Sequence, residues 1–169
     1  REALNLYGDK ATDSIMEEIN QLENKHVWSY VLPEKVKRRI TDGDNILPSS
    51  IFLKEKFDAF NNFEKLKSRL VACGNYEYNV EINTESPTGS INTLYIILDL
   101  AARNNLDIDT IDISGAYLNR ESEAHHMMRL PKSVSEIIIK HDPTKQIYAD
   151  SKKNLIVELK RTLYGPKES

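Results

Sequence analysis

The sequence predicts an α+β protein in which helices pack on an antiparallel sheet. Two segments carry apolar residues at helical spacing, and short β-branched or alternating runs bounded by turn residues lie between and after them. The composition agrees, because 40% hydrophobic and 29% charged residues are typical of a folded globular chain rather than a disordered tail. The 169 residues are enough for one ordinary domain or for part of a larger one.

The first helix is expected near residues 13–25. The run from Ser14 to Glu17 is typical of a capping box, in which the Glu17 side chain reaches back to the start of the helix. Apolar residues follow at helical spacing. They are Ile15, Met16, Ile19 and Leu22.

Strands are expected on both sides of a loop at residues 41–50, which is rich in glycine, proline and serine. The β-branched and aromatic run 27–32 predicts a strand that a proline stops. Residues 51–57 and 66–73 predict the two strands of a hairpin, with residues 58–63 as their connection.

A second helix is expected after Pro87, with Ser90 or Thr88 as its N-cap and residues 104–105 as its end. The alternating run 106–113 then predicts a strand. The remaining expected elements are a short helix at 133–140, a turn near 150–153 and a strand at 154–159.

Nothing in the sequence predicts membrane insertion or secretion. No stretch approaches the roughly 18 apolar residues that span a bilayer, and the first residues contain no signal-peptide core. The single Cys73 excludes an internal disulfide, which fits a reducing compartment. We therefore expect an intracellular protein. Because the chain begins with Arg1 rather than Met, we also expect it to be a piece of something longer.

Two basic clusters stand out against a net charge of −3. One is the run from Lys35 to Arg39, and the other comprises Lys54, Lys56, Lys65, Lys67 and Arg69. Two interpretations stay open, namely a solvated surface and a set of contacts to nucleic-acid phosphates.

Asp112 is the leading candidate for chemistry. An Asp at the end of a strand beside Ile113 can offer a carboxylate oxygen and a neighbouring backbone carbonyl to one hard cation such as Mg²⁺. A two-metal site needs further carboxylates from elsewhere. Taken without context, Asp112 is a turn or cap residue, and Tyr117, five positions later, is core packing or an exposed ring.

The segment Asp112-Ile113-Ser114-Gly115-Ala116-Tyr117-Leu118 resembles the first catalytic motif of reverse transcriptases, and the chain as a whole resembles the polymerase of copia-type LTR retrotransposons. Further segments match that family in the correct order along the chain. They are Glu18 to Trp28, Lys67-Ser68-Arg69-Leu70-Val71-Ala72-Cys73-Gly74, Ser86-Pro87 with the helix ending Leu100-Ala101-Ala102, Met127 to Pro131, and Leu163 to Ser169.

The resemblance implies the fingers and an incomplete palm of a reverse transcriptase, about 1–90 and 91–169, within a Pol polyprotein. It implies that Asp112 binds Mg²⁺, with Ile113 beside it, and that Tyr117 is the steric gate that rejects the 2′-OH of ribonucleotides. Lys67 and Arg69 would help to hold the incoming triphosphate or the template strand. The implied partners are an RNA or DNA template-primer and a dNTP, and the implied location is the cytoplasm, a virus-like particle or the nucleus.

The sequence departs from the family at several positions, and it ends before the Tyr-x-Asp-Asp motif that carries the other metal-binding acids. Cys73, Glu85, His126, Pro166 and Glu168 replace the family's usual residues. We therefore expect the isolated chain to be inactive as a nucleotidyltransferase. A decayed or repurposed module that binds nucleic acid or protein without catalysis is the alternative.

Overall fold

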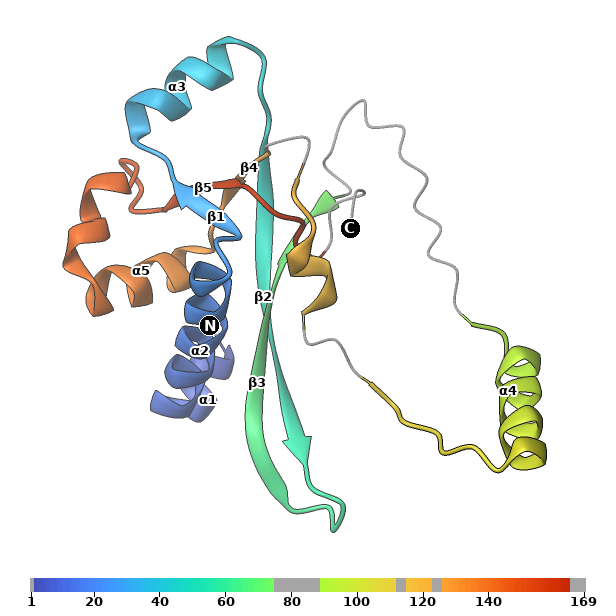
Figure 1. Cartoon of the computed structure of the whole chain (residues 1–169). Coiled ribbons are helices and arrows are strands. Elements are labelled where there is room, and N and C mark those ends of the chain that lie inside the picture. The colour runs from blue at the N-terminus through green and yellow to red at the C-terminus, as the bar shows by residue number, and fades with distance from the viewer. Residues whose placement is uncertain (1, 75–88, 112–114, 123–125, 165–169) are drawn as a thin grey trace.

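The computed structural model describes residues 2–74, 89–111, 115–122 and 126–164, and it has an α+β fold built on one mixed sheet (Figure 1). The helices are α1 (Glu2–Tyr7), α2 (Asp9–Asn24), α3 (Pro33–Thr41), α4 (Ile91–Asn104) and α5 (Lys132–His141), with 3-10 helices η2 (Ala116–Asn119) and η3 (Pro143–Tyr148). The strands are β1 (Trp28–Tyr30), β2 (Ile46–Phe57), β3 (Phe63–Ala72), β4 (Met127–Arg129) and β5 (Ile156–Leu159).

The strand order within the described residues is β1-β5-β4-β2-β3. All neighbouring pairs are antiparallel except β2 and β4, which run parallel with Ile46 opposite Met127. The prediction of an antiparallel sheet is therefore wrong in this respect. β2 is long enough to pair with β4 at its start and with β3 along most of its length, so the β2–β3 hairpin projects beyond the rest of the sheet (Figure 1).

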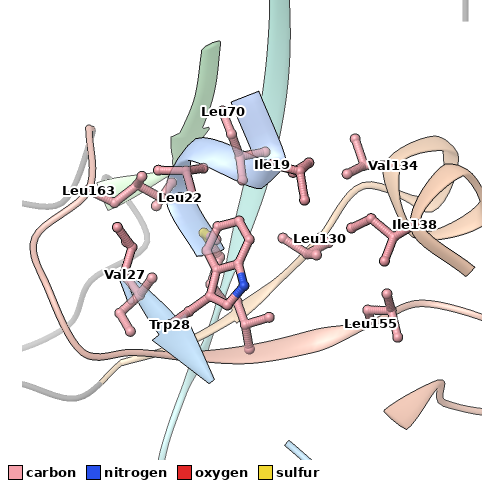
Figure 2. Close-up of a cluster of buried hydrophobic side chains, with 14 of the residues drawn as sticks. Ile19, Leu22, Val27, Trp28, Leu70, Leu130, Val134, Ile138, Leu155 and Leu163 are labelled. Atoms are coloured by element: carbon pink, nitrogen blue, oxygen red, sulfur yellow. The ribbon is translucent and has the colours of Figure 1, made fainter. Parts of the chain in front are cut away.

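The main core lies where α2 and α5 pack on the sheet (Figure 2). Trp28 of β1 lies among aliphatic side chains from both helices and from three strands. The buried members labelled in the figure are Ile19, Leu22, Val27, Trp28, Leu70, Leu130, Val134, Ile138, Leu155 and Leu163. Burying such side chains contributes roughly 1.5–3 kcal/mol each, so this cluster fixes the position of β3 against α2.

Several expected elements are confirmed with shifted ends. The hairpin, α4, α5 and β5 lie where the sequence predicts them. The Ser90 hydroxyl accepts a hydrogen bond from Thr93 N at 3.1 Å, and Asn105 ends α4 in the left-handed conformation. Thr88, the other candidate cap, lies outside the described residues.

Other expectations are wrong. α2 begins at Asp9, so Ser14 is not a cap but a buried helix residue. The strand expected at 27–32 is confirmed as β1, but Pro33 after it begins a helix that was not expected, in the first turn of α3, a position that suits its fixed φ angle. Residues 46–50 belong to β2 rather than to a loop, and residues 106–111 form no strand. No helix within the described ranges is long and apolar enough to cross a membrane.

Candidate nucleic-acid interface

The β2–β3 hairpin has two chemically different faces, because successive side chains of a strand point to opposite sides. The register places three pairs opposite one another on one face, with a bulge near the turn. These pairs are Phe52 with Arg69, Lys54 with Lys67, and Lys56 with Lys65. The alternate pairs on the other face include Ile51 with Leu70 and Leu53 with Ser68.

The second face is held against α2 by hydrogen bonds as well as by apolar packing. The buried Ser14 hydroxyl lies 2.9 Å from the hydroxyl of Ser68 and donates to the carbonyl of Leu66 at 3.1 Å. Leu70 N donates to Glu18 Oε1 at 3.0 Å. Because α2 thereby satisfies polar groups of β3, which is an edge strand, the hairpin cannot rotate without losing these bonds.

The opposite face therefore presents its cations to solvent. We call Phe52, Lys54, Lys56, Lys65, Lys67 and Arg69 the basic face; all six residues are exposed. Phe52, Lys54, Lys56, Lys67 and Arg69 line a shallow hollow of about 520 Å³. Like charges directly opposite one another on a sheet destabilise it. A face with two such Lys–Lys pairs consequently favours a bound polyanion.

No carboxylate among the described residues forms an ion pair with the lysines of this face or with Arg69. The nearby Glu55 belongs to the other face, where its carboxylate accepts a hydrogen bond from Tyr7 Oη at 2.7 Å. The guanidinium of Arg69 instead lies 4.5 Å from the centre of the Tyr164 ring. The backbone of Tyr164 accepts a hydrogen bond from Ala72 N at 2.9 Å, which holds that ring beside the end of β3. Arg69 is thus oriented by a ring, and its charge, with that of Lys67, acts on the carboxylate of Glu18 without forming an ion pair.

The structure brings Lys67 and Arg69, two of the predicted site residues, to the same face. Asp112 and Ile113 lie outside the residues that the structure describes. Tyr117 belongs to η2, but the position of its side chain also lies outside what is described. Among the described residues, no three His, Cys, Asp or Glu side chains form a group that could hold a metal ion.

The sequence indicates a structural role for Phe52, and it groups Lys54 and Lys56 with Lys67 in one basic cluster without assigning them to one face. A signal was present, because Phe52, Lys54 and Lys56 alternate in one strand and Lys65, Lys67 and Arg69 alternate in the next. The register of the hairpin, which the sequence leaves open, decides that the two rows face each other.

The other basic cluster has a structural role in part. On α3, the guanidinium of Arg39 contacts both Asp44 and Glu158 at 2.5 Å, and Lys35 Nζ lies 3.9 Å from Glu158. Burial of Glu158 opposes its ionisation, but the hydrogen bond and charge of Lys160, with the charges of Lys35 and Arg39, outweigh it and lower the pKa of its carboxyl group. Arg39 therefore helps to fix α3 to β5.

The comparisons with known proteins add no assignment to this geometry. No family model matches the chain, and no solved structure matches it.

Proposed function

We propose that the chain is part of an RNA-directed DNA polymerase, the reverse transcriptase of a copia-type LTR retrotransposon, and that its basic face holds nucleic-acid phosphates. The observation that carries the phosphate contact is the pairing of Lys54 with Lys67 and of Lys56 with Lys65 on an exposed face. Lys and Arg suit phosphate as a point charge and as a planar fork, respectively. The order of the sequence motifs around Asp112 supports the polymerase assignment.

In this proposal Asp112 and the carbonyl of Ile113 belong to the magnesium site, and Tyr117 excludes the 2′-OH of a ribonucleotide. These roles rest on the resemblance of the motif. Mg²⁺ binding further depends on carboxylates that the complete polymerase would supply, since a two-metal site needs more than one acid. The intact enzyme would bind a template-primer and a dNTP.

Removal of charge from the basic face tests the phosphate contact. We expect the Lys54→Gln/Lys67→Gln double variant to bind a labelled RNA–DNA template-primer more weakly than the unaltered chain. Each lost phosphate contact should also reduce the slope of log affinity against log salt by about one. Fluorescence anisotropy at a series of salt concentrations measures both quantities.

The matched control is Lys37→Gln/Arg38→Gln, which removes the same charge from exposed positions of α3. We expect it to change the salt dependence less than the hairpin variant does. Equal losses from the two double variants would mean that the basic face is no preferred site, and an unaltered slope for the hairpin variant would contradict the proposal.

A second candidate function is a decayed or repurposed module that binds nucleic acid without catalysis. The basic face favours it, because its residues lie on the hairpin and need neither Asp112 nor a metal. The replacements at Cys73, Glu85, His126, Pro166 and Glu168 are also unusual for the family that the chain resembles. Binding would then survive in the absence of any polymerase partner.

A primer-extension assay tests whether the 169-residue chain catalyses DNA synthesis by itself. With Mg²⁺ or Mn²⁺, an RNA template, a DNA primer and dNTPs, we expect no product, because Asp112 is the one catalytic acid assigned in this sequence. Synthesis that disappears in Asp112→Asn would contradict this expectation. A palm segment that carries the other metal-binding acids can be added as a separate polypeptide. If it restores synthesis that depends on Asp112, the polymerase assignment is favoured over the non-catalytic module.

A further inference from the structure

The loop that joins β2 and β3 holds an aromatic side chain out in solvent. Phe60 is 85% exposed. The loop around it is stabilised without any contribution from the ring, since Asp58 Oδ1 accepts hydrogen bonds from Phe60 N and Asn62 N, both at 2.8 Å. Asn61 adopts the left-handed conformation that the turn requires, which Asn tolerates better than most residues. The fold thus presents Phe60 on a fixed loop.

Two further aromatic rings support the base of this loop. Phe57 and Phe63 are opposite one another in the register, and their rings meet edge to face with centroids 6.3 Å apart. Such a pair stabilises a hairpin next to its turn, so these two rings have a structural use. Phe60 takes no part in this pair.

The cations of the basic face lead along the strands toward this loop. Lys54 and Lys56 on β2, and Lys65 and Lys67 on β3, repeat every second residue, a spacing of roughly 7 Å along each strand. That spacing is comparable with the distance between neighbouring phosphates of an extended nucleic-acid strand. A strand whose phosphates follow the lysines would reach the loop that carries Phe60.

We propose that Phe60 stacks on an unpaired base of a single-stranded nucleic acid whose phosphates lie on the basic face. This inference rests on the phosphate contact proposed above and specifies its ligand. A free base offers its π-face to an aromatic side chain, whereas a duplex keeps that face inside the stack. An exposed ring in the loop that follows the last Lys–Lys pair therefore favours a single strand over a duplex.

The basic face carries five cations and no carboxylate, which favours a polyanion as its occupant over a second protein surface of mixed charge. Asp58 near the loop is engaged by the turn, and its hydrogen bonds with Asn62 and Phe60 lower the pKa of its carboxyl group. Glu55 is engaged by Tyr7. Of the cations on the basic face, Lys67 and Arg69 interact with the charge of Glu18, and none of the five forms an ion pair with a described carboxylate.

The experiment measures binding of a labelled single-stranded oligonucleotide and of a blunt duplex of equal length by anisotropy. The variants are Phe60→Ala, the Lys54→Gln/Lys67→Gln pair, and Ile147→Ala as a control, because Ile147 is a 64% exposed apolar residue on η3. We expect Phe60→Ala to weaken single-strand binding on the order of tenfold and to leave duplex binding and the salt slope unchanged. The control should alter neither affinity.

The outcomes separate this inference from the proposed function. If the lysine variant weakens binding but Phe60→Ala does not, the phosphate contact stands and the stacking role is wrong. If neither ligand binds, or the lysine variant changes nothing, both proposals are wrong. Phosphatidylserine vesicles and sedimentation velocity complete the test. Loss of vesicle binding or of self-association in Phe60→Ala, with oligonucleotide affinity intact, would overturn the stacking role.

Discussion

At the scale of single residues, Glu18 links the stability of the hairpin to the charge of its surroundings. Its carboxylate accepts the N–H of Leu70, which lies on the edge strand. Burial raises the pKa of Glu18, and the hydrogen bond from Leu70 with the charges of Arg69 and Lys67 offsets only part of that rise. Ionised Glu18 therefore gives Leu70 N its hydrogen-bond acceptor, but the partial burial of its charge lowers the stability of the folded state.

Two substitutions separate these effects. Glu18→Gln keeps a carbonyl acceptor for Leu70 N and removes the half-buried charge, so we expect a free energy of unfolding at pH 7 equal to or above that of the unaltered chain. Glu18→Ala leaves the N–H of Leu70 without its acceptor, and we expect a loss of about 1–3 kcal/mol. Urea unfolding measures both, and equal losses for Gln and Ala would contradict the role of the hydrogen bond.

The difference in unfolding free energy between the unaltered chain and Glu18→Gln should change with pH in a defined direction. The pKa of Glu18 is higher in the folded state than in the unfolded state. The contribution of its protonation to the free energy of unfolding is therefore fully present below the unfolded pKa. That contribution is lost as the pH rises through the folded pKa. The stability advantage of Glu18→Gln should therefore be small in acid and should grow toward neutral pH. An advantage that is constant with pH would point to a cause other than ionisation.

At the scale of secondary-structure elements, the sequence predicts what is decided locally. The apolar spacing of α4 and its Ser90 cap, the periodicity of α5 and the turn before β5 are all short-range signals, and each is confirmed. α3 was missed because its surface is mostly charged and Val36 is its one buried residue, so it lacks the stripe that marks a packed helix.

The errors have tertiary causes. Ser14 matches a capping box locally, but its hydroxyl is used by Leu66 and Ser68 of a distant strand. Residues 106–111 alternate in polarity, yet no strand lies beside them in the described part of the chain to complete a ladder. For the candidate site, the sequence could identify the cluster of lysines with Arg69 but not which residues pair across the strands, because register depends on pairing.

At the scale of the whole molecule, α4 differs from every helix that forms the core. It stands apart from the sheet (Figure 1), and Ala101 is its one buried residue. The exposed large ones are Ile91, Leu94, Tyr95, Ile96, Ile97, Leu98 and Leu100. An apolar helix face normally packs on a partner surface, and an isolated helix of this length is marginal in water.

A pair of Leu→Ala substitutions tests this division of the molecule. Leu22 of α2 is fully buried, so Leu22→Ala should lower the free energy of unfolding by about 2–5 kcal/mol. Leu94 of α4 is 53% exposed, so Leu94→Ala should change the free energy by less than about 0.5 kcal/mol. Urea unfolding of the 169-residue chain measures the difference, and hydrogen exchange should find the amides of α4 less protected than those of α2. A loss for Leu94→Ala as large as that for Leu22→Ala would mean that α4 packs against the sheet in solution.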